Sequence, residues 1–127
     1  MKTRIALGLA LILACCLSPA SADEAAGRLV QINFKFSVTA AEYEQAVQSM
    51  ATPIAQVPGL RWKVWLMNEQ EHEAGGIYLF DTESSANAYL NGPIVAAVLR
   101  HPALSDFAVR QFDALRDLSA VTRGPLR

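Results

Sequence analysis

Cysteine is nearly absent from this chain, and both cysteines, Cys15 and Cys16, lie near its start. Beyond residue 22 no cysteine remains, which excludes a disulfide, a thiol nucleophile and a cysteine-based metal site there. Only two histidines occur, and they do not have the spacing of a metal-binding pair. The chain also lacks a glycine-rich phosphate loop, a dinucleotide fingerprint and a nucleophile elbow. We therefore expect no cofactor and no metal ion.

A hydrophobic run long enough to anchor the chain in a membrane is also missing. Lys2 and Arg4 precede an apolar run at residues 5–17, and the run is followed by Ala20-Ser21-Ala22. A membrane-spanning helix needs roughly 20 apolar residues. A basic start, a shorter apolar run and a small-residue cleavage site are typical of a secretory signal peptide. We expect a signal peptide at residues 1–22 and a periplasmic or secreted protein.

A second interpretation of this first segment stays open. The residues Ile12-Leu13-Ala14-Cys15 resemble the lipobox of bacterial lipoproteins, in which the cysteine becomes the acylated first residue. Leu13 is atypical for its place in that pattern, whereas the Ala-Ser-Ala site downstream is a good ordinary one. We favour soluble export, without stable membrane insertion after cleavage, and keep acylation at Cys15 as the alternative.

A basic stripe is missing as well. Removing residues 1–22 takes away two of the 11 basic residues and none of the 12 acidic ones, which leaves a net charge of −3. A mildly acidic domain of this kind argues against nucleic acid as the partner. We assign residues 23–28 to a flexible lead and residues 29–127 to one small domain, with a C-terminal tail at 114–127 that crosses to a partner subunit in one interpretation.

The remaining pattern predicts four strands and three helical segments. Thr39 and Glu42 form a capping box that starts a helix at residues 40–55, which Pro53 should kink or break near Ala51. Further helices are expected from Thr82 to Asn91 and from Pro93 to His101. The predicted strands are Arg28–Val38, Leu60–Met67, Gly75–Phe80 and Phe107–Asp113. The order β-α-β-β-α-β is that of the α+β, ferredoxin-like folds, with a four-stranded antiparallel sheet.

The alternation within the strands predicts which residues face the helices. The fully apolar set of the second strand should pack on the helices, as should Ile77 and Leu79 of the third; that set is Leu60, Trp62, Val64 and Leu66. The opposite face would then carry Lys63, Trp65, Met67, Tyr78, Asn33 and Phe112. A large exposed aromatic patch is unusual for a monomer, so we expect a second subunit to bury it in a homodimer.

Two blocks of sequence carry a family resemblance. Pro58-Gly59-Leu60-Arg61-Trp62-Lys63-Val64-Trp65 is followed by Ala74-Gly75-Gly76-Ile77-Tyr78-Leu79-Phe80, and then by Ala86-x-x-Tyr89-Leu90. With these blocks the chain resembles the YdhR-type monooxygenase family, and a looser similarity covers residues 29 to 119. The resemblance implies a member of the dimeric α+β-barrel superfamily, which includes antibiotic-biosynthesis monooxygenases and haem-degrading enzymes. It also implies a homodimer with a pocket between each sheet and its helices or partner.

The resemblance further implies a function and a set of site residues. Cofactor-independent monooxygenases of this superfamily act on electron-rich phenols, whose own anion passes an electron to oxygen. The expected function is oxygenation of an aromatic or quinol-like small molecule. The expected catalytic residues are Lys63, which would stabilise the phenolate, Tyr78, which would relay a proton, and His72, if its loop closes over the pocket. The expected substrate-binding residues are Asn33, Trp65, Met67 and Phe112.

Other interpretations of the same residues stay open. Trp65 and Tyr78 would equally suit the packing of a dimer interface, with Lys63 in solvent. His72 lies among three glutamates in a polar loop, where a solvated histidine is common. Haem degradation is weakly supported, because no histidine lies squarely on a predicted helix. A non-catalytic module that binds a small apolar ligand, or acts in stress, is the alternative function.

Overall fold

The computed structural model describes residues 25–126. The expected signal peptide and the alternative acylation site at Cys15 lie outside the described residues. The strands are β1 (Ala25–Phe36), β2 (Leu60–Asn68), β3 (Glu73–Phe80) and β4 (Leu104–Leu115). The helices are α1 (Ala40–Gln48), α2 (Ala51–Ala55), α3 (Glu83–Leu90), α4 (Pro93–Leu99) and α5 (Arg116–Val121).

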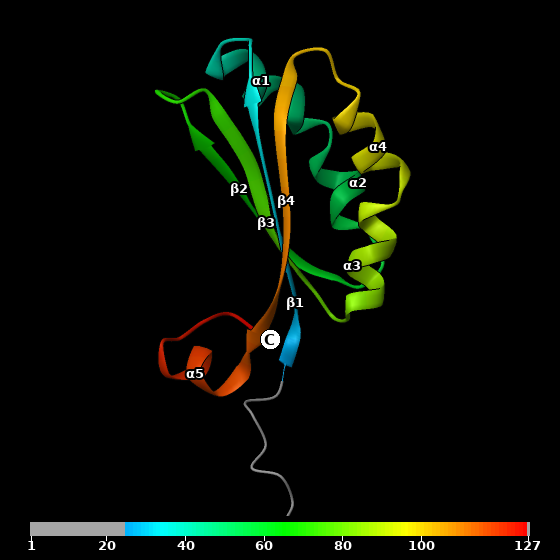
Figure 1. Ribbon diagram of the computed structural model, residues 1–127, viewed down its shortest axis with the longest axis vertical. Helices are drawn as coiled ribbons and strands as arrows, with labels where there is room; N and C mark the ends of the chain where they lie inside the picture. Colours follow the sequence, from blue (N-terminus) through cyan, green and yellow to red (C-terminus); the bar gives the residue numbers. More distant parts are fainter. Residues whose placement is uncertain (1–24, 127) are drawn as a thin grey trace, which may run out of the picture.

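The four strands form one antiparallel sheet in the order β2-β3-β1-β4. Helices α1 to α4 all cover one face of this sheet, whereas α5 lies on the other side (Figure 1). We call the first face the helix face and the second the open face. The protein therefore has the predicted α+β, ferredoxin-like fold.

β1 supplies the centre of the core. Its even-numbered residues from Val30 to Phe36 are all buried on the helix face. The ring of Phe36 stacks on Tyr43 of α1, with 5.1 Å between the ring centroids. β1 begins at Ala25, so the last residues of the expected flexible lead belong to a strand. The pairing of β1 with β4 has a register shift between Ala25 and Arg28, next to Gly27, so β1 extends to Ala25 through an irregular stretch.

The helix boundaries follow the local signals in the sequence. The capping box of Thr39 and Glu42 is present at the start of α1. The predicted break before Pro53 is confirmed, because α1 ends at Gln48 and the separate helix α2 begins at Ala51. The side chain of Thr82 caps α3, and Pro93 is the first residue of α4.

The predicted face is confirmed for Leu60, which packs against the core, but the predicted faces of β3 and of β2 beyond Leu60 are wrong. Val30 of β1 pairs with Tyr78 of β3, and Tyr78 pairs in turn with Lys63 of β2. Directly paired residues lie on the same face of a sheet, so Lys63 and Tyr78 lie on the helix face with the buried residues of β1. Trp65 and Met67 follow at the same period and share this face. The apolar set of Trp62, Val64, Leu66, Ile77 and Leu79 lies on the open face.

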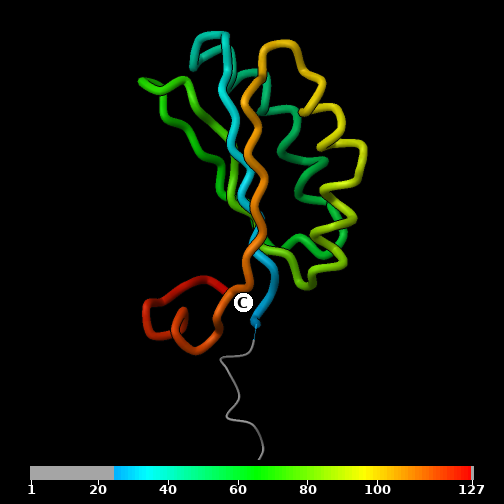
Figure 2. Tube along the Cα trace, viewed as in Figure 1, coloured from blue at the N-terminus to red at the C-terminus, as the bar shows by residue number. Residues whose placement is uncertain are grey.

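The C-terminal segment packs on the open face of its own chain. β4 runs on to Leu115, and the chain then turns into α5 and returns beneath the sheet (Figure 2). Trp62 Nε1 donates a hydrogen bond to the carbonyl of Pro125 at 2.7 Å, and Arg61 Nη1 donates one to the carbonyl of Leu126 at 2.7 Å. Residues 114–126 are thus a strand end, a helix and a return segment attached to β2.

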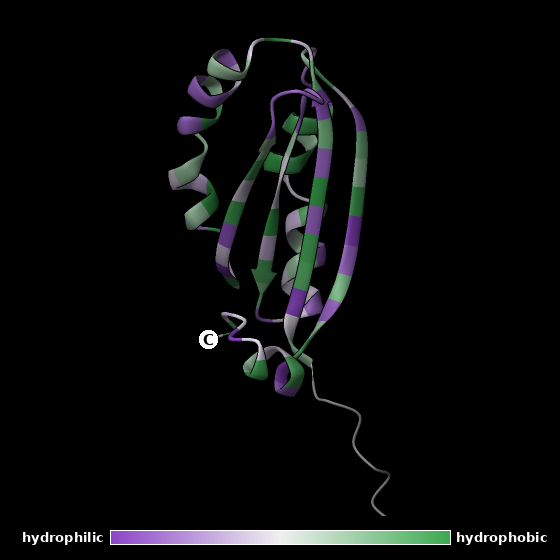
Figure 3. Cartoon of the chain, turned by 90° about the vertical axis from the view of Figure 1, so that its left-hand side faces the viewer, coloured by the Kyte–Doolittle hydropathy of each residue, from purple (hydrophilic) through white to green (hydrophobic). Residues whose placement is uncertain are grey.

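The open face remains uncovered above this segment. Apolar and polar residues alternate along its strands, which face the viewer in Figure 3. Val64 and Phe112 are about half exposed there, at 51% and 47%. Within residues 25–126, no helix is long and apolar enough to cross a membrane.

Candidate functional site

A small apolar cavity lies between the sheet and its helices. Its volume is about 50 Å³. The sheet contributes Lys63, Trp65 and Tyr78 to its lining, and the helices contribute Tyr43 and Met50, among others. The cavity therefore brings together three of the site residues that the sequence predicted, on the helix face rather than on the face expected to meet a partner.

Lys63 is held between two aromatic rings. Its Nζ lies 3.2 Å from the ring centroid of Trp65 and 4.6 Å from that of Tyr78. Both distances are within the range of a cation–π interaction, which is strongest with tryptophan. None of the acidic side chains in residues 25–126 forms an ion pair with Lys63. Within the described part of the chain, the groups that face the charge of this amine are therefore the two aromatic rings.

Gly76 makes the space in which the Lys63 side chain lies. Gly76 pairs with Trp65 on β2 and with Ile32 on β1, so a side chain at this position would point toward the helices. A Cβ atom built on Gly76 would lie 2.6 Å from Cε of Lys63 and 3.3 Å from a ring carbon of Tyr78. The missing side chain lets Lys63 lie flat between Trp65 and Tyr78.

Burial changes the acid–base chemistry of Lys63. Desolvation penalises the charged form of an amine, and it lowers the pKa of Lys63 from 10.5 to about 7. Near neutral pH a substantial fraction of the side chain is then a free amine. A free amine in an apolar cavity can accept a proton from an acidic ligand, and its ammonium form can stabilise a bound anion.

Tyr78 and Tyr89 form a buried pair of phenols. The hydroxyl of Tyr89 donates a hydrogen bond to the hydroxyl of Tyr78 at 3.3 Å, and the ring centroids are 5.2 Å apart. Burial raises the pKa of Tyr78 above its usual range, and the neighbouring Tyr89 adds to this effect. Tyr78 therefore stays protonated. One hydrogen bond joins the two hydroxyls, so the pair keeps one O–H that can be donated to a ligand in the cavity, which both tyrosines line.

His72 does not line the cavity. It is an exposed residue in the turn between β2 and β3, with a positive φ of 48°. Its carbonyl accepts a hydrogen bond from the N–H of Phe36 at 2.9 Å, and its ring lies 5.2 Å from the ring of Phe36. The neighbouring Glu71 and Glu73 are within ion-pair distance of Lys35. These contacts tie the turn to the end of β1, so a catalytic role for His72 gains no support from the geometry.

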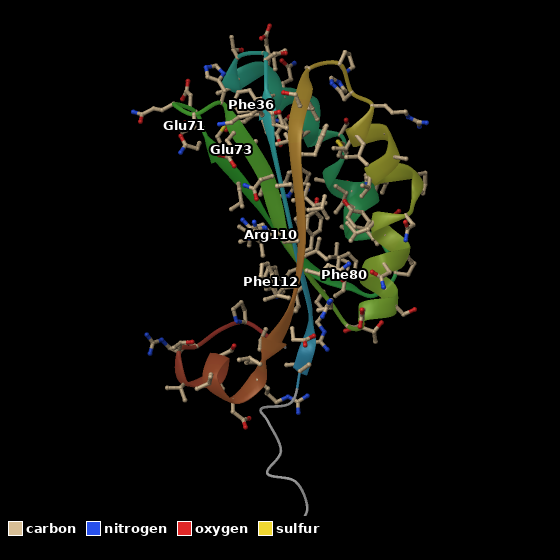
Figure 4. The ribbon with its side chains drawn as sticks, in the orientation of Figure 1. Phe36, Glu71, Glu73, Phe80, Arg110 and Phe112 are labelled. Atoms are coloured by element: carbon tan, nitrogen blue, oxygen red, sulfur yellow. The ribbon has the colours of Figure 1, made fainter. Side chains whose placement is uncertain are left out.

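Three of the predicted substrate-binding residues also lie outside the cavity. Asn33 is on the open face, where it accepts a hydrogen bond from Gln31 at 2.9 Å and lies 3.4 Å from Glu73. Phe112 projects from β4 on the side away from the helices (Figure 4). Met67 shares the helix face with Trp65 but lies two residues farther along β2, opposite Ala74. Of that predicted set, only Trp65 lines the cavity.

Tyr89 and Gly76 belong to the site but were not among the predicted site residues, although each carries a signal in the sequence. Tyr89 has the helical spacing of a core residue, and a buried tyrosine hydroxyl usually needs a hydrogen-bond partner. Gly76 belongs to a Gly-Gly pair inside a strand, a pattern that often marks a close approach of another group. Neither signal by itself says that Tyr89 lines a cavity or that Gly76 leaves space for Lys63.

A metal centre has no candidate in the described part of the chain. Residues 25–126 contain no group of three or more histidine, cysteine, aspartate or glutamate side chains placed to hold a metal ion. The polar chemistry of the cavity rests instead on one amine and on the phenol pair.

Comparison with known families places most of the chain. Residues 29–125 match the model of the family described as "Putative mono-oxygenase ydhR". Among curated proteins, none matches the sequence significantly. The match covers far more than half of the chain and includes both the cavity and the C-terminal segment.

Solved structures share the fold at low sequence identity. The cofactor-independent oxygenase SnoaB from Streptomyces nogalater aligns with a TM-score of 0.57 and 20% identity, covering 72% of this chain and 97% of that one. The haem degrader MhuD from Mycobacterium tuberculosis gives 0.55 and 21%, covering 70% and 97%. A "putative antibiotic biosynthesis monooxygenase" from Deinococcus radiodurans gives 0.57 and 16%, covering 68% and 91%. At these identities the likeness establishes the fold alone.

Proposed function

The chain belongs to the ydhR mono-oxygenase family, and from this premise we propose that it oxygenates a phenol or quinol without a cofactor. One observation carries the proposal: the amine of Lys63 borders an apolar cavity between the rings of Trp65 and Tyr78. The apolar lining matches the chemistry of an aromatic ring, and the amine matches an ionisable hydroxyl on that ring. The solved oxygenase with the same fold, SnoaB, is itself described as cofactor-independent.

Lys63 acts as the base in this proposal. Its free amine takes the phenolic proton, and the resulting ammonium pairs with the phenolate in a site of low dielectric. The electron-rich phenolate then transfers one electron to O2. The two radicals combine at a ring carbon to give a peroxide.

Tyr78 and Lys63 then handle the protons of the peroxide. The ammonium of Lys63 returns its proton to the terminal peroxide oxygen, and the hydroxyl of Tyr78 donates a hydrogen bond that stabilises the developing charge. The O–O bond breaks as the ring carbon loses its hydrogen. One oxygen atom becomes a quinone carbonyl, and the other leaves as water. The substrate supplies all the electrons, so phenol and O2 balance against quinone and water.

The test is oxygen uptake with a panel of phenols and quinols. We expect uptake above the protein-free control, rising with pH through about 7 as Lys63 loses its proton. Lys63→Met should lower the rate by about 10²–10⁴-fold, the usual contribution of a positioned acid or base. Lys35→Met is the matched control, because Lys35 lies in the ion pairs at the end of β1, away from the cavity.

One outcome would contradict the oxygenase activity, and another would contradict the role of the cavity in it. Uptake equal to the protein-free control with every compound at saturation would leave a module that only binds a small ligand. Equal losses in Lys63→Met and Lys35→Met would remove the role given to the cavity. Trp65→Ala should weaken ligand binding in either case, because the ring forms one wall of the cavity.

We also propose that the protein is exported. The basic start, the short apolar run and the Ala-Ser-Ala site before Asp23 support cleavage after Ala22. The intact mass of the protein produced in its native type of cell should then correspond to a chain that begins at Asp23. A membrane-associated product with an acylated Cys15 would instead establish the lipoprotein alternative, and an uncleaved chain would exclude both.

A further inference from the structure

The cavity beside Lys63 is too small for the ligand that the proposed function requires. Its volume is about 50 Å³, whereas an apolar cavity of about 150 Å³ is of the size that holds a benzene ring. Lys63 and Met50 have flexible side chains whose movement can enlarge it. Ile32 and Ile54, in contrast, are buried core residues in its wall. Room for one ring is therefore within reach, and room for fused rings is not.

A larger apolar groove lies directly outside this cavity. It has a volume of about 330 Å³ between α1, α4 and the start of β4. Both helices cover the same face of the sheet (Figure 1). Five side chains line the inner cavity and the outer groove at once, so the wall between them is one side chain thick. These residues are Tyr43, Val47, Met50, Val98 and Leu104.

The lining of this groove is mostly apolar, and its one carboxylate and its one imidazole already have hydrogen-bond partners. Glu42 accepts hydrogen bonds from the N–H and the hydroxyl of Thr39 at 2.9 Å. His101 Nδ1 accepts one from the N–H of Ala103 at 3.1 Å. A polar ligand would find few free groups here, whereas an aliphatic chain would bury its surface without leaving a polar group unpaired.

We propose that the substrate is an alkyl-substituted phenol or quinol with a single ring, and that its aliphatic chain occupies the groove between α1 and α4. This inference rests on the proposed function for the position of the ring beside Lys63. Only one layer of side chains separates the cavity from this groove, so the aliphatic chain can enter the groove when a flexible side chain of that layer, such as Met50, moves. A second groove of about 440 Å³, between α2 and α3, shares only Tyr89 with the inner cavity and is lined partly by Ser84 and Ser85.

A series of para-alkylphenols from methyl to decyl tests the inference by calorimetric titration. Each methylene that enters the groove should tighten binding about fourfold, until the groove is full. Ala46→Trp should abolish this dependence on chain length and leave the affinity for the shortest phenol nearly unchanged. Ala46 is an exposed residue of α1 that lines the outer groove and not the inner cavity.

Ala88→Trp is the matched control. Ala88 is an exposed helical alanine like Ala46, but it lines the groove between α2 and α3. This variant should keep the full dependence on chain length. Ala97→Trp, which fills the outer groove from α4, replaces Ala46→Trp if that variant does not fold.

Three results would overturn the inference. These are affinities that do not depend on chain length, an equal loss in Ala88→Trp, and tighter binding of a fused-ring phenol than of any alkylphenol. Oxygen uptake is measured separately on the same compounds. Chain-dependent binding without any uptake would keep the groove assignment and reject the oxygenase, so the two failures are distinguishable.

Discussion

Lys63 is the residue in which the structure concentrates the chemistry of this protein. It is a cation within an apolar layer, and its nearest charge-compensating groups are the rings of Trp65 and Tyr78. A cation–π contact gives back about 0.5–2 kcal/mol, which is less than the usual penalty for removing a charge from water. The fold thus carries a cost at this position, as is common where a side chain serves function rather than stability.

Because of this buried amine, the free energy of unfolding should depend on pH. Because burial lowers the pKa of Lys63 from 10.5 to about 7, the unfolded chain holds a proton between these values that the folded chain has released. Unfolding takes up a proton in this window, so the free energy of unfolding rises with pH across it. Below pH 7 both states are protonated, and the folded state bears the full penalty.

Lys63→Met should therefore be more stable than the wild type at pH 6, by about 1–4 kcal/mol if it follows other replacements of buried charges. Its advantage should shrink as the pH rises above 7. Urea unfolding at a series of pH values measures the difference, with Lys35→Met as the variant that removes a charge outside the cavity. A constant gap between Lys63→Met and wild type at every pH would contradict the burial of the amine.

At the scale of the strand, the two neighbouring glycines of β3 have opposite roles. Gly75 has a φ of +153°, and a Cβ atom there would lie 1.8 Å from the backbone oxygen of Ile32. A Cβ atom at Gly76 would meet the far end of the Lys63 side chain, which can move, and would lie 3.1 Å from the backbone oxygen of Val64. One glycine allows two backbones to approach, and the other leaves space for the site.

Gly75→Ala should destabilise the fold by at least about 2–3 kcal/mol, because both the backbone conformation and its neighbour forbid a side chain. Gly76→Ala should cost about 1 kcal/mol or less, since Lys63 can move. The displaced amine would come closer to water, which should raise its pKa and shift the pH dependence of oxygen uptake upward. Thermal unfolding and the uptake profile measure the two effects, and equal destabilisation by both alanines would refute the distinction.

The elements up to β4 could be predicted from the sequence, but helix α5 and the faces of two strands could not. Thr39, Pro53 and Pro93 mark helix boundaries through local chemistry, so the order of elements is confirmed. In β2 apolar side chains occur on both faces, and choosing the fully apolar set placed Lys63 in the wrong layer. A shift of one residue inverts every side chain of a strand, and the register shift between Leu60 and Trp62 lies within β2.

Pairing with β1 contained the missing information. The buried face of β1 is unambiguous, and large residues there oppose small ones on β3: Phe34 pairs with Ala74, and Ile32 with Gly76. This match of sizes sets the register and leaves the space that Lys63 and Trp65 occupy. Lys63, Trp65 and Tyr78 lie together because the faces of β2 and β3 are both the reverse of the prediction. Asn33 and Phe112 lie on the open face as predicted, so they are separated from those three residues.

The whole molecule presents an open sheet face that one chain covers only in part. The C-terminal segment occupies one end, and beyond it Val64 and Phe112 remain about half exposed. We propose that a second copy of the chain covers this surface. Of the residues from which the sequence predicted a dimer, only Phe112 and Asn33 lie on this face. Val64, Leu66 and Ile77 lie on it beside Phe112 and add apolar surface that a second copy would bury.

Sedimentation equilibrium tests the dimer directly. The wild type should sediment as a dimer, and Val64→Lys should shift it to a monomer by placing a charge in the centre of the apolar surface. Ala88→Lys adds the same charge on the exposed side of α3 and should remain dimeric. A monomeric wild type, or a dimer that tolerates Val64→Lys, would assign the open face to another role.

The low pKa of Lys63 also allows occupancy of the cavity to be measured by chemical labelling of this amine. Beyond residue 22 the sequence has only two lysines, Lys35 and Lys63, and amine-reactive compounds modify only the unprotonated form. At neutral pH a small electrophile such as cyanate should therefore carbamylate Lys63 ahead of an ordinary lysine. A compound that fills the cavity would shield this amine and leave Lys35 as the internal reference. Mass spectrometry of the labelled protein could then screen metabolites for occupancy of the cavity before any reaction is known.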